Sequence, residues 1–291
     1  MRAGLPPGVA TAGIGLFAAA LMTSGLGAQQ PDFSSRVEVI RVDVLVTDNG
    51  KPVEGLTAAN FELLDNGVPQ TVDLAARDEH LNVILALDAS GSVSGSRLDD
   101  LRQAGRSLLG GLRRGDRAGL LTFSHLIALG SELTSDMSRV QAAVDRLAGT
   151  GDTALVDGTY AALLLAEEDA GRSLLVIFSD GLDGVSWLTP EAVVGVARRC
   201  NVVVYAVAVG GAASPFLRDV AAATGGRTLD LGSTKNLSAT FLEILGEFRG
   251  RYAISFTPKG VGRDAGWHRL QVRVKGRRVA VKARAGYFAG G

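Results

Sequence analysis

The sequence predicts an α/β fold with a doubly wound, mostly parallel sheet and a small β-rich unit built from the two flanks of the chain. Near-continuous apolar runs alternate with segments of helical periodicity from about Leu81 to Gly250, and both flanks show the period-two alternation of half-exposed strands. The 291 residues are 46% hydrophobic but only 5% aromatic, and 38 are Gly. This composition indicates a sizeable aliphatic core and many tight turns.

The central region carries the predicted parallel sheet. Each apolar run is expected to be a strand that is buried on both faces, because helices cover both faces of a parallel sheet. The runs are Leu81–Leu87, Ala118–Phe123, Ser173–Phe178 and Val202–Val209, with a short strand at Arg227–Leu231. Helices are predicted at about 98–112, 140–147, 155–166, 190–199, 215–224 and 237–248. This alternation predicts one α/β domain over residues 81–250.

The flanks carry the predicted β-rich unit. From Ile40 to Val46 every second residue is apolar while the opposite face carries most of the charge, which is typical of a strand with one wet face. Further strands are predicted at 60–64, 71–74, 252–256, 267–274 and 279–284, the last two forming a hairpin around Lys275–Arg278. Residues 33–80 and 251–291 are each too short to hold a core, so we expect them to pack together.

The amino terminus resembles a targeting segment. Arg2 precedes a stretch of apolar or small residues over 9–26. The small residues Gly25, Gly27 and Ala28 lie at or just after the end of this stretch. This predicts a signal peptide over residues 1–28, cleaved near Gly27 or Ala28, and a secreted or periplasmic protein. Because Leu26 is large, an uncleaved anchor remains an alternative, and the membrane is an expected partner only in that case.

Charge and cysteine content narrow the function classes. Lys plus Arg and Asp plus Glu each number 30, so no net charge attracts the chain to nucleic acid. The single cysteine, Cys200, permits neither an internal disulfide nor a thiolate metal cluster, and it is expected to be a small packing residue. The three histidines, His80, His125 and His268, lack the spacing of a zinc site.

Polar side chains follow the first buried strand at the point where it passes into a helix. Asp88, Ser90 and Ser92 supply one carboxylate and two hydroxyls, and Gly91 allows a tight loop between them. Ligands of open α/β sheets bind outside the carboxyl ends of the strands, where this loop is expected. Oxygen donors of this kind are preferred by hard divalent cations such as Mg²⁺.

Two neighbouring loops are expected to add donors to the same edge. Thr153 follows a glycine-rich turn before a predicted helix, and Asp180 ends the third buried strand. The five groups together contain two carboxylates, which roughly balance a doubly charged ion. Ser and Asp after a strand are also common helix N-caps, so each residue alone has a purely structural interpretation.

The polar residues at this predicted edge resemble a motif of a known protein family. Asp88-Ala-Ser90-Gly-Ser92, Thr153 and Asp180-Gly181 are similar in order and spacing to the complete metal-ion-dependent adhesion site of von Willebrand factor A domains. The flanks resemble the ends of a bacterial family of exported proteins that contain this domain. The segments that carry the second resemblance are Val42–Asp48, Gly55–Thr57, Phe61, Asp65–Gly67, Pro69–Gln70 and Arg284–Tyr287.

The resemblance implies roles for the five residues. Ser90, Ser92 and Thr153 would bind the ion directly or nearly so, and Asp88 and Asp180 directly or through water. The implied cofactor is Mg²⁺, with Mn²⁺ or Ca²⁺ as alternatives. A free coordination position would take an exposed Asp or Glu of a protein partner. The chain departs from the commoner pattern at Asp152, where Gly is frequent.

The predicted function is therefore an exported, metal-dependent protein-binding module that is not an enzyme. One alternative is a structural component of an envelope complex whose A domain needs no metal. Another is a metal-assisted hydrolase using Asp88 and Asp180, for which no His or Glu is obviously placed as general base. Trp187, after the Asp180 loop, either contacts a partner or packs against its own loop.

Overall fold

The computed structural model describes residues 39–75, 79–167, 171–180, 182–211, 213–262 and 266–289. The predicted signal peptide, residues 1–28, lies outside the described residues, as does Gly181. Across the described ranges no helix has both the length and the apolar character of a membrane span.

A six-stranded sheet forms the centre of the α/β domain, in the order β11-β10-β9-β6-β7-β8. Its strands are β6 (Leu81–Asp88), β7 (Arg117–Phe123), β8 (Ile127–Thr134), β9 (Arg172–Ser179), β10 (Val202–Val209) and β11 (Arg227–Leu231). All neighbouring strands are parallel except β7 and β8, which are antiparallel. Because β6 is central, the carboxyl ends of β7 and β9 lie on either side of its own.

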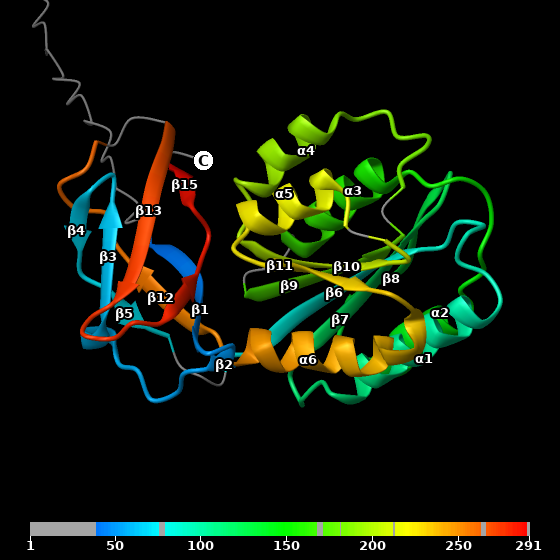
Figure 1. Cartoon of the computed structure of the whole chain (residues 1–291), viewed down its shortest axis with the longest axis horizontal. Coiled ribbons are helices and arrows are strands. Elements are labelled where there is room, and N and C mark those ends of the chain that lie inside the picture. The colour runs from blue at the N-terminus through cyan, green and yellow to red at the C-terminus, as the bar shows by residue number, and fades with distance from the viewer. Residues whose placement is uncertain are drawn as a thin grey trace, which may run out of the picture. The chain divides into compact units, whose positions relative to one another are not determined.

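Helices cover both faces of this sheet (Figure 1). One face carries α3 (Leu155–Glu167), α4 (Pro190–Ala197) and α5 (Pro215–Ala223), and the other carries α1 (Ser96–Gly110), α2 (Met137–Asp145) and α6 (Leu237–Arg249). Two of these helices begin at a clear capping signal, since Thr189 and Ser214 each accept a backbone hydrogen bond and precede a Pro.

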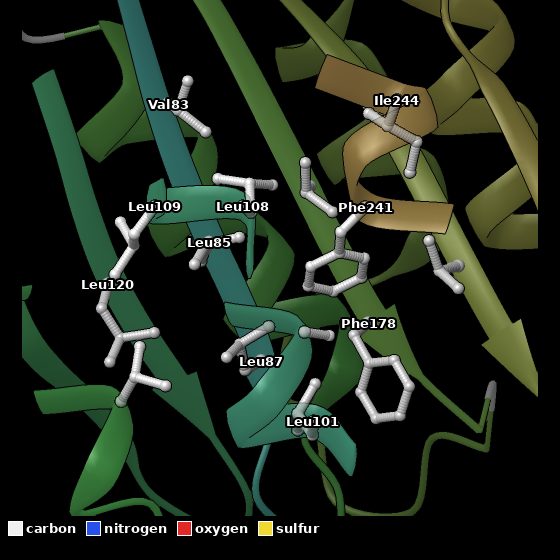
Figure 2. Close-up of a cluster of buried hydrophobic side chains, with 14 of the residues drawn as sticks. Val83, Leu85, Leu87, Leu101, Leu108, Leu109, Leu120, Phe178, Phe241 and Ile244 are labelled. Carbon is white, nitrogen blue, oxygen red and sulfur yellow. The ribbon is translucent and has the colours of Figure 1, made fainter. Parts of the chain in front are cut away.

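The strand β6 supplies both faces with core residues. Val83, Leu85 and Leu87 pack with α1 and α6, as Figure 2 shows, while Ile84 and Ala86 pack with α3 on the opposite face. Every residue of β6 is buried. Alternate side chains of a strand point to opposite faces, so a strand covered on both sides must be apolar throughout. The predicted doubly wound fold class is confirmed.

The edge strand β8 was not predicted from the sequence. Its first four residues, Ile127–Gly130, are all exposed, so it lacks the apolar run that marks the buried strands. It reverses direction after β7 through residues 124–126 and pairs with β7 across register shifts. A strand at a sheet edge has one side open to solvent, and its composition therefore resembles a loop.

Strands from both flanks form two further sheets. One has the order β14-β1-β12-β5, with β2 beside β1, and the other has the order β15-β13-β3-β4. The amino-terminal strands are β1 (Ile40–Asp48), β2 (Lys51–Pro52), β3 (Phe61–Asp65), β4 (Val68–Gln70) and β5 (Asp73–Leu74). The carboxyl-terminal strands are β12 (Tyr252–Phe256), β13 (Gly266–Val274), β14 (Ala280–Lys282) and β15 (Gly286–Ala289). Short 3₁₀ turns lie at Ala58–Asn60 and Thr234–Asn236.

The two sheets share one hydrophobic core, to which both flanks contribute. Val42 and Val44 of β1 and Ile254 of β12 pack with Leu63 of β3 and Leu270 of β13. The predicted hairpin between β13 and β14 is wrong, because β14 pairs with β1 while β13 pairs with β3 and β15. The turn at 275–278 therefore carries the chain from one sheet to the other.

Candidate metal site at the carboxyl edge of the sheet

Asp88 is the last residue of β6 and is completely buried. Its Oδ1 accepts a hydrogen bond from the backbone N–H of Ser90 at 2.9 Å, and its Oδ2 accepts one from the hydroxyl of Ser179 at 2.8 Å. Both contacts follow from topology, because Ser179 ends the adjacent strand β9 and Leu87 pairs with Phe178. The carboxylate is thus held in one orientation at the central strand end.

The electrostatic environment of Asp88 is unfavourable for a negative charge. Burial raises the pKa of the Asp88 carboxyl above its usual range, against the hydrogen bonds from Ser90 and Ser179, and the charge of Asp180 raises it further. No Lys, Arg or His within the described ranges forms an ion pair with Asp88 or Asp180. A cation bound here would offset this uncompensated charge.

Ser90 and Ser92 bring their hydroxyls together beside Asp88. The two Oγ atoms lie 3.0 Å apart. Adjacent ligands of an octahedral ion with bonds of about 2.1 Å are separated by about 3.0 Å, so this spacing suits Mg²⁺. It is also an ordinary hydrogen-bond distance, so it permits the ion without requiring it. Gly91, between the two serines, donates its N–H to Gly151 O at 2.8 Å.

The loop that contains Thr153 packs directly on the Asp88–Ser92 loop. Thr150 donates its N–H to Ala89 O at 2.8 Å. Gly149 makes the approach possible, because a Cβ there would lie 2.2 Å from Val93 O and 2.9 Å from Ser90 O. Thr153 itself is 8% exposed and lies two residues before the start of α3. The backbone therefore brings these two loops, far apart in sequence, into contact.

Asp180 follows Ser179 at the end of β9 and is half-buried. Its Oδ1 accepts a hydrogen bond from the N–H of Leu182 at 3.3 Å, and its charge acts on Asp88. Asp152, the departure from the common pattern, is exposed. The structure thus places Asp88 at the end of β6, and Ser90, Ser92, Thr153 and Asp180 on three adjoining loops at the same edge of the sheet.

The donor set fits a hard divalent cation rather than a soft one. No group of three or more His, Cys, Asp or Glu side chains in the described part of the chain converges as a metal site. A metal held at the edge would therefore depend on the hydroxyls of Ser90, Ser92 and Thr153 beside the two carboxylates. Such oxygen ligands suit Mg²⁺, Ca²⁺ or Mn²⁺.

Several residues at this edge were not assigned a role from the sequence. Ser179 is completely buried and orients Asp88, and the signal was its place at the end of the strand beside β6. Asp183 Oδ1 accepts hydrogen bonds from Leu155 N at 2.8 Å and Ser186 Oγ at 2.6 Å, and so attaches the following loop to the start of α3. Asp157 of α3 does the same from the other side.

The chain belongs to the von Willebrand factor type A domain family, since the model of that domain matches residues 82–241. Domains of this family are typically protein-interaction modules. The matched range begins in β6 and ends in α6, so it covers the six-stranded sheet and all three loops of the candidate site.

Solved structures share the fold at low sequence identity. A von Willebrand factor type A protein from Catenulispora acidiphila is 14% identical and matches with a TM-score of 0.52 over 88% of this chain and 74% of its own. Proximal thread matrix protein 1 from the mussel byssus, in a structure with a zinc-occupied adhesion-site motif, is 16% identical with a TM-score of 0.54, over 63% and 49% of the two chains.

One curated relative is similar in sequence over a shorter range. An uncharacterized protein of Synechocystis sp. (strain PCC 6803) is 31% identical over an alignment of 108 residues, and the match covers 33% of this chain and 26% of the relative. The chain thus spans about a quarter of that protein, and about half of the mussel protein.

Proposed function

We propose that the chain binds a divalent cation through Asp88, Ser90, Ser92, Thr153 and Asp180 and uses it to hold an acidic side chain of a partner protein. The observation that supports this most is the uncompensated charge of Asp88, which is buried beside Asp180 and two converging hydroxyls. A bound cation would supply electrophilic character and a free coordination position. The family's role in protein interaction supports the same function.

The five residues would have different roles in binding the cation. Ser90, Ser92 and Thr153 present neutral oxygens, which leave the ion able to attract a further carboxylate. Asp88 would contribute charge from a fixed position, because both of its oxygens accept hydrogen bonds. Asp180 would supply the second charge from a less buried position. The limited charge of this set favours a partner that brings a carboxylate of its own.

Export and the absence of enzymatic activity remain predictions. The export prediction depends on residues 1–28, which are outside the described ranges. A metal-independent structural role is the alternative that the following experiment separates from metal binding.

Calorimetric titration of the full chain with MgCl₂ and MnCl₂ tests the proposal. We expect saturable binding by the parent, no binding by Asp88→Ala, and unchanged binding by Asp99→Ala, which removes an exposed carboxylate of α1. Equal binding by the parent and Asp88→Ala would refute the site. No binding by the parent would favour the structural role or an ion captured only together with a partner, and a repeat with an acidic peptide present would separate these two.

A further inference from the structure

Exposed hydrophobic side chains gather beside the candidate site. Among the described residues, eleven large hydrophobic side chains are exposed, and seven of them belong to two segments that leave the carboxyl edge of the sheet. The first segment is the turn from β7 to β8 together with the first residues of β8, and the second connects β9 to α4. We call this set the apolar rim: Leu126, Ile127, Leu129, Leu182, Val185, Trp187 and Leu188.

Both segments are attached to the residues around Thr153. Ser124, before Leu126, accepts a hydrogen bond from Ala154 N at 2.8 Å, and Gly184 donates its N–H to Thr153 O at 2.9 Å. The apolar rim therefore flanks the proposed metal site rather than lying elsewhere on the molecule. A partner that reaches the metal would meet these side chains.

Trp187 is the most exposed of them, at 94%, although its backbone is firmly held. The N–H groups of Trp187 and Leu188 each donate to the Asp157 carboxylate at 2.9 Å. Ser186 Oγ accepts from Val156 N at 3.1 Å and donates to Asp183 Oδ1 at 2.6 Å. The loop is thus fixed in a conformation that directs its largest apolar side chain to solvent. Preorganised tryptophans of this kind are frequent anchors of protein interfaces.

The charges near the apolar rim restrict its partner. Residues 124–129 and 180–188 contain no Lys or Arg, whereas Asp180 and Asp183 carry carboxylates and Asp152 is exposed nearby. Interfacial membrane-binding surfaces combine apolar residues with Lys and Arg, so an anionic membrane is disfavoured. Apart from Arg97, whose Nη1 lies 3.5 Å from Ser92 O, these charges are negative and would repel a run of acidic residues, which favours a partner with one carboxylate for the metal.

We propose that the apolar rim and the metal site together bind a protein segment in which a single Asp or Glu is flanked by large apolar side chains, one of which packs on Trp187. This inference rests on the proposed function and specifies its partner. The carboxylate would reach the metal while the neighbouring apolar residue covers the indole. Affinity would then require both the ion and Trp187.

The test is selection of a random peptide library on the immobilised full chain in MgCl₂, with elution by EDTA. We expect the recovered peptides to share one acidic residue next to Phe, Leu, Ile or Trp. Synthetic versions are then titrated against the parent and variants, with tryptophan fluorescence as readout in a Trp267→Phe background, because the chain has only two Trp. Trp187 emission should shift to shorter wavelength on binding.

Trp187→Ala should weaken the selected peptide at least tenfold, with binding then followed by calorimetry. The variant keeps the backbone N–H that Asp157 accepts, so the loop should stay in place. Leu242→Ala, which truncates an exposed side chain of α6, is the matched control and should leave affinity unchanged. Replacing the peptide's acidic residue by its amide should abolish metal-dependent binding.

The outcomes separate the two proposals. The proposed role of the apolar rim would be overturned, and the metal site left intact, by either of two results. The metal-dependent peptides could lack apolar residues beside the acidic one, or Trp187→Ala could bind them as well as the parent does. Peptides retained equally in EDTA would overturn the proposed function and the inference with it. Failure to recover any peptide, or binding instead to vesicles of phosphatidylcholine and phosphatidylserine, would overturn the inference.

Discussion

The carboxyl and amino edges of the central sheet differ in whether their buried charged groups have ion-pair partners. At the carboxyl edge, Asp88 and Asp180 lie close together without an ion-pair partner within the described residues. At the amino edge, buried arginines meet acceptors from the β-rich unit and from neighbouring helices. Both ends bury charge, but among the described residues ion pairs neutralise it at the amino edge alone.

Arg172, the first residue of β9, illustrates the amino edge. Its Nε and Nη2 donate to Asp43 Oδ1 at 2.8 and 2.6 Å, and its guanidinium lies 5.0 Å from the ring centroid of Phe248. Arg284, near the end of the chain, donates to Asn201 Oδ1 at 2.6 Å and to Arg198 O at 2.8 Å. These contacts attach the β-rich unit to the α/β domain.

The difference indicates what each edge is for. A buried charge is costly unless it is paired or hydrogen-bonded. Where the chain provides the partner, the charge holds the structure together. Where the chain provides no partner, the charge is available to bind a cation from solution, which is the physical basis of the proposed metal site. The following variants test this distinction, from the largest expected effect to the smallest.

Arg172→Ala should lower the free energy of unfolding by about 3 to 5 kcal/mol, because it leaves the largely buried Asp43 without its cation. Urea denaturation measures this change. Arg106→Ala is the control, since its pair with Asp145 is 2.8 Å long but roughly 40% exposed on both sides, and should change stability by less than about 1 kcal/mol. Equal effects of the two variants would contradict the view that the amino edge depends on buried pairing.

Asp116→Asn tests the amino edge by pH. Burial opposes ionisation of Asp116, but hydrogen bonds from Arg249, Leu81 N–H and Arg113 N–H outweigh it and hold the pKa below its usual range. A carboxyl with a lowered folded-state pKa stabilises the protein above its unfolded-state pKa, about 4, and loses this contribution as pH falls through the folded-state value.

We therefore expect Asp116→Asn to cost about 2 kcal/mol at pH 7, as for hydrogen bonds to charged groups. The difference from the parent should shrink as the pH is lowered below about 4. Urea denaturation at a series of pH values measures it. A difference that stays constant down to pH 3 would show that the side chain's shape, and not its charge, carries the effect.

Gly149→Ala tests the geometry of the carboxyl edge without removing a proposed ligand. The added Cβ would overlap Val93 O and force the Thr153 loop away from the Asp88–Ser92 loop. We expect a loss of about 2 kcal/mol in stability from this overpacking, together with weaker Mg²⁺ binding in calorimetry. Gly195→Ala, in α4 where an added Cβ meets nothing within 4 Å, is the control. Unchanged Mg²⁺ affinity in Gly149→Ala would argue against a site shared by the two loops.

Asp88→Asn should have the smallest effect on stability and the opposite sign. Removing a buried charge that lies beside Asp180 should raise the stability of the metal-free chain by about 1 kcal/mol, as at other sites where function opposes stability. The same variant should lose the stabilisation that MgCl₂ gives the parent. Thermal unfolding in EDTA and in MgCl₂ measures both, and destabilisation in EDTA would indicate that Asp88 is structural.

Much of the α/β domain could be predicted because its strands have a local signature. The runs that became β6, β9 and β10 are buried at every position, and a strand covered by helices on both faces has no polar side. The strand β8 lacked that signature because it is an edge. The sequence also did not show which strands pair in the β-rich unit. The pattern of β14 is compatible with pairing to β1 or to β13, and the packing of the two sheets selects β1.

For the candidate site, the sequence by itself determined which oxygen-bearing residues follow which strands, and the five proposed ligands remain a prediction that the geometry supports. Only the tertiary structure decided how their loops touch, through Gly149 and the backbone bonds around Ala89. It alone revealed that Ser179 orients Asp88 and that Trp187 is exposed. Composition and periodicity indicate whether a residue can be buried. Which residues become neighbours across strands and loops depends on long-range packing, and the local sequence pattern does not specify that packing.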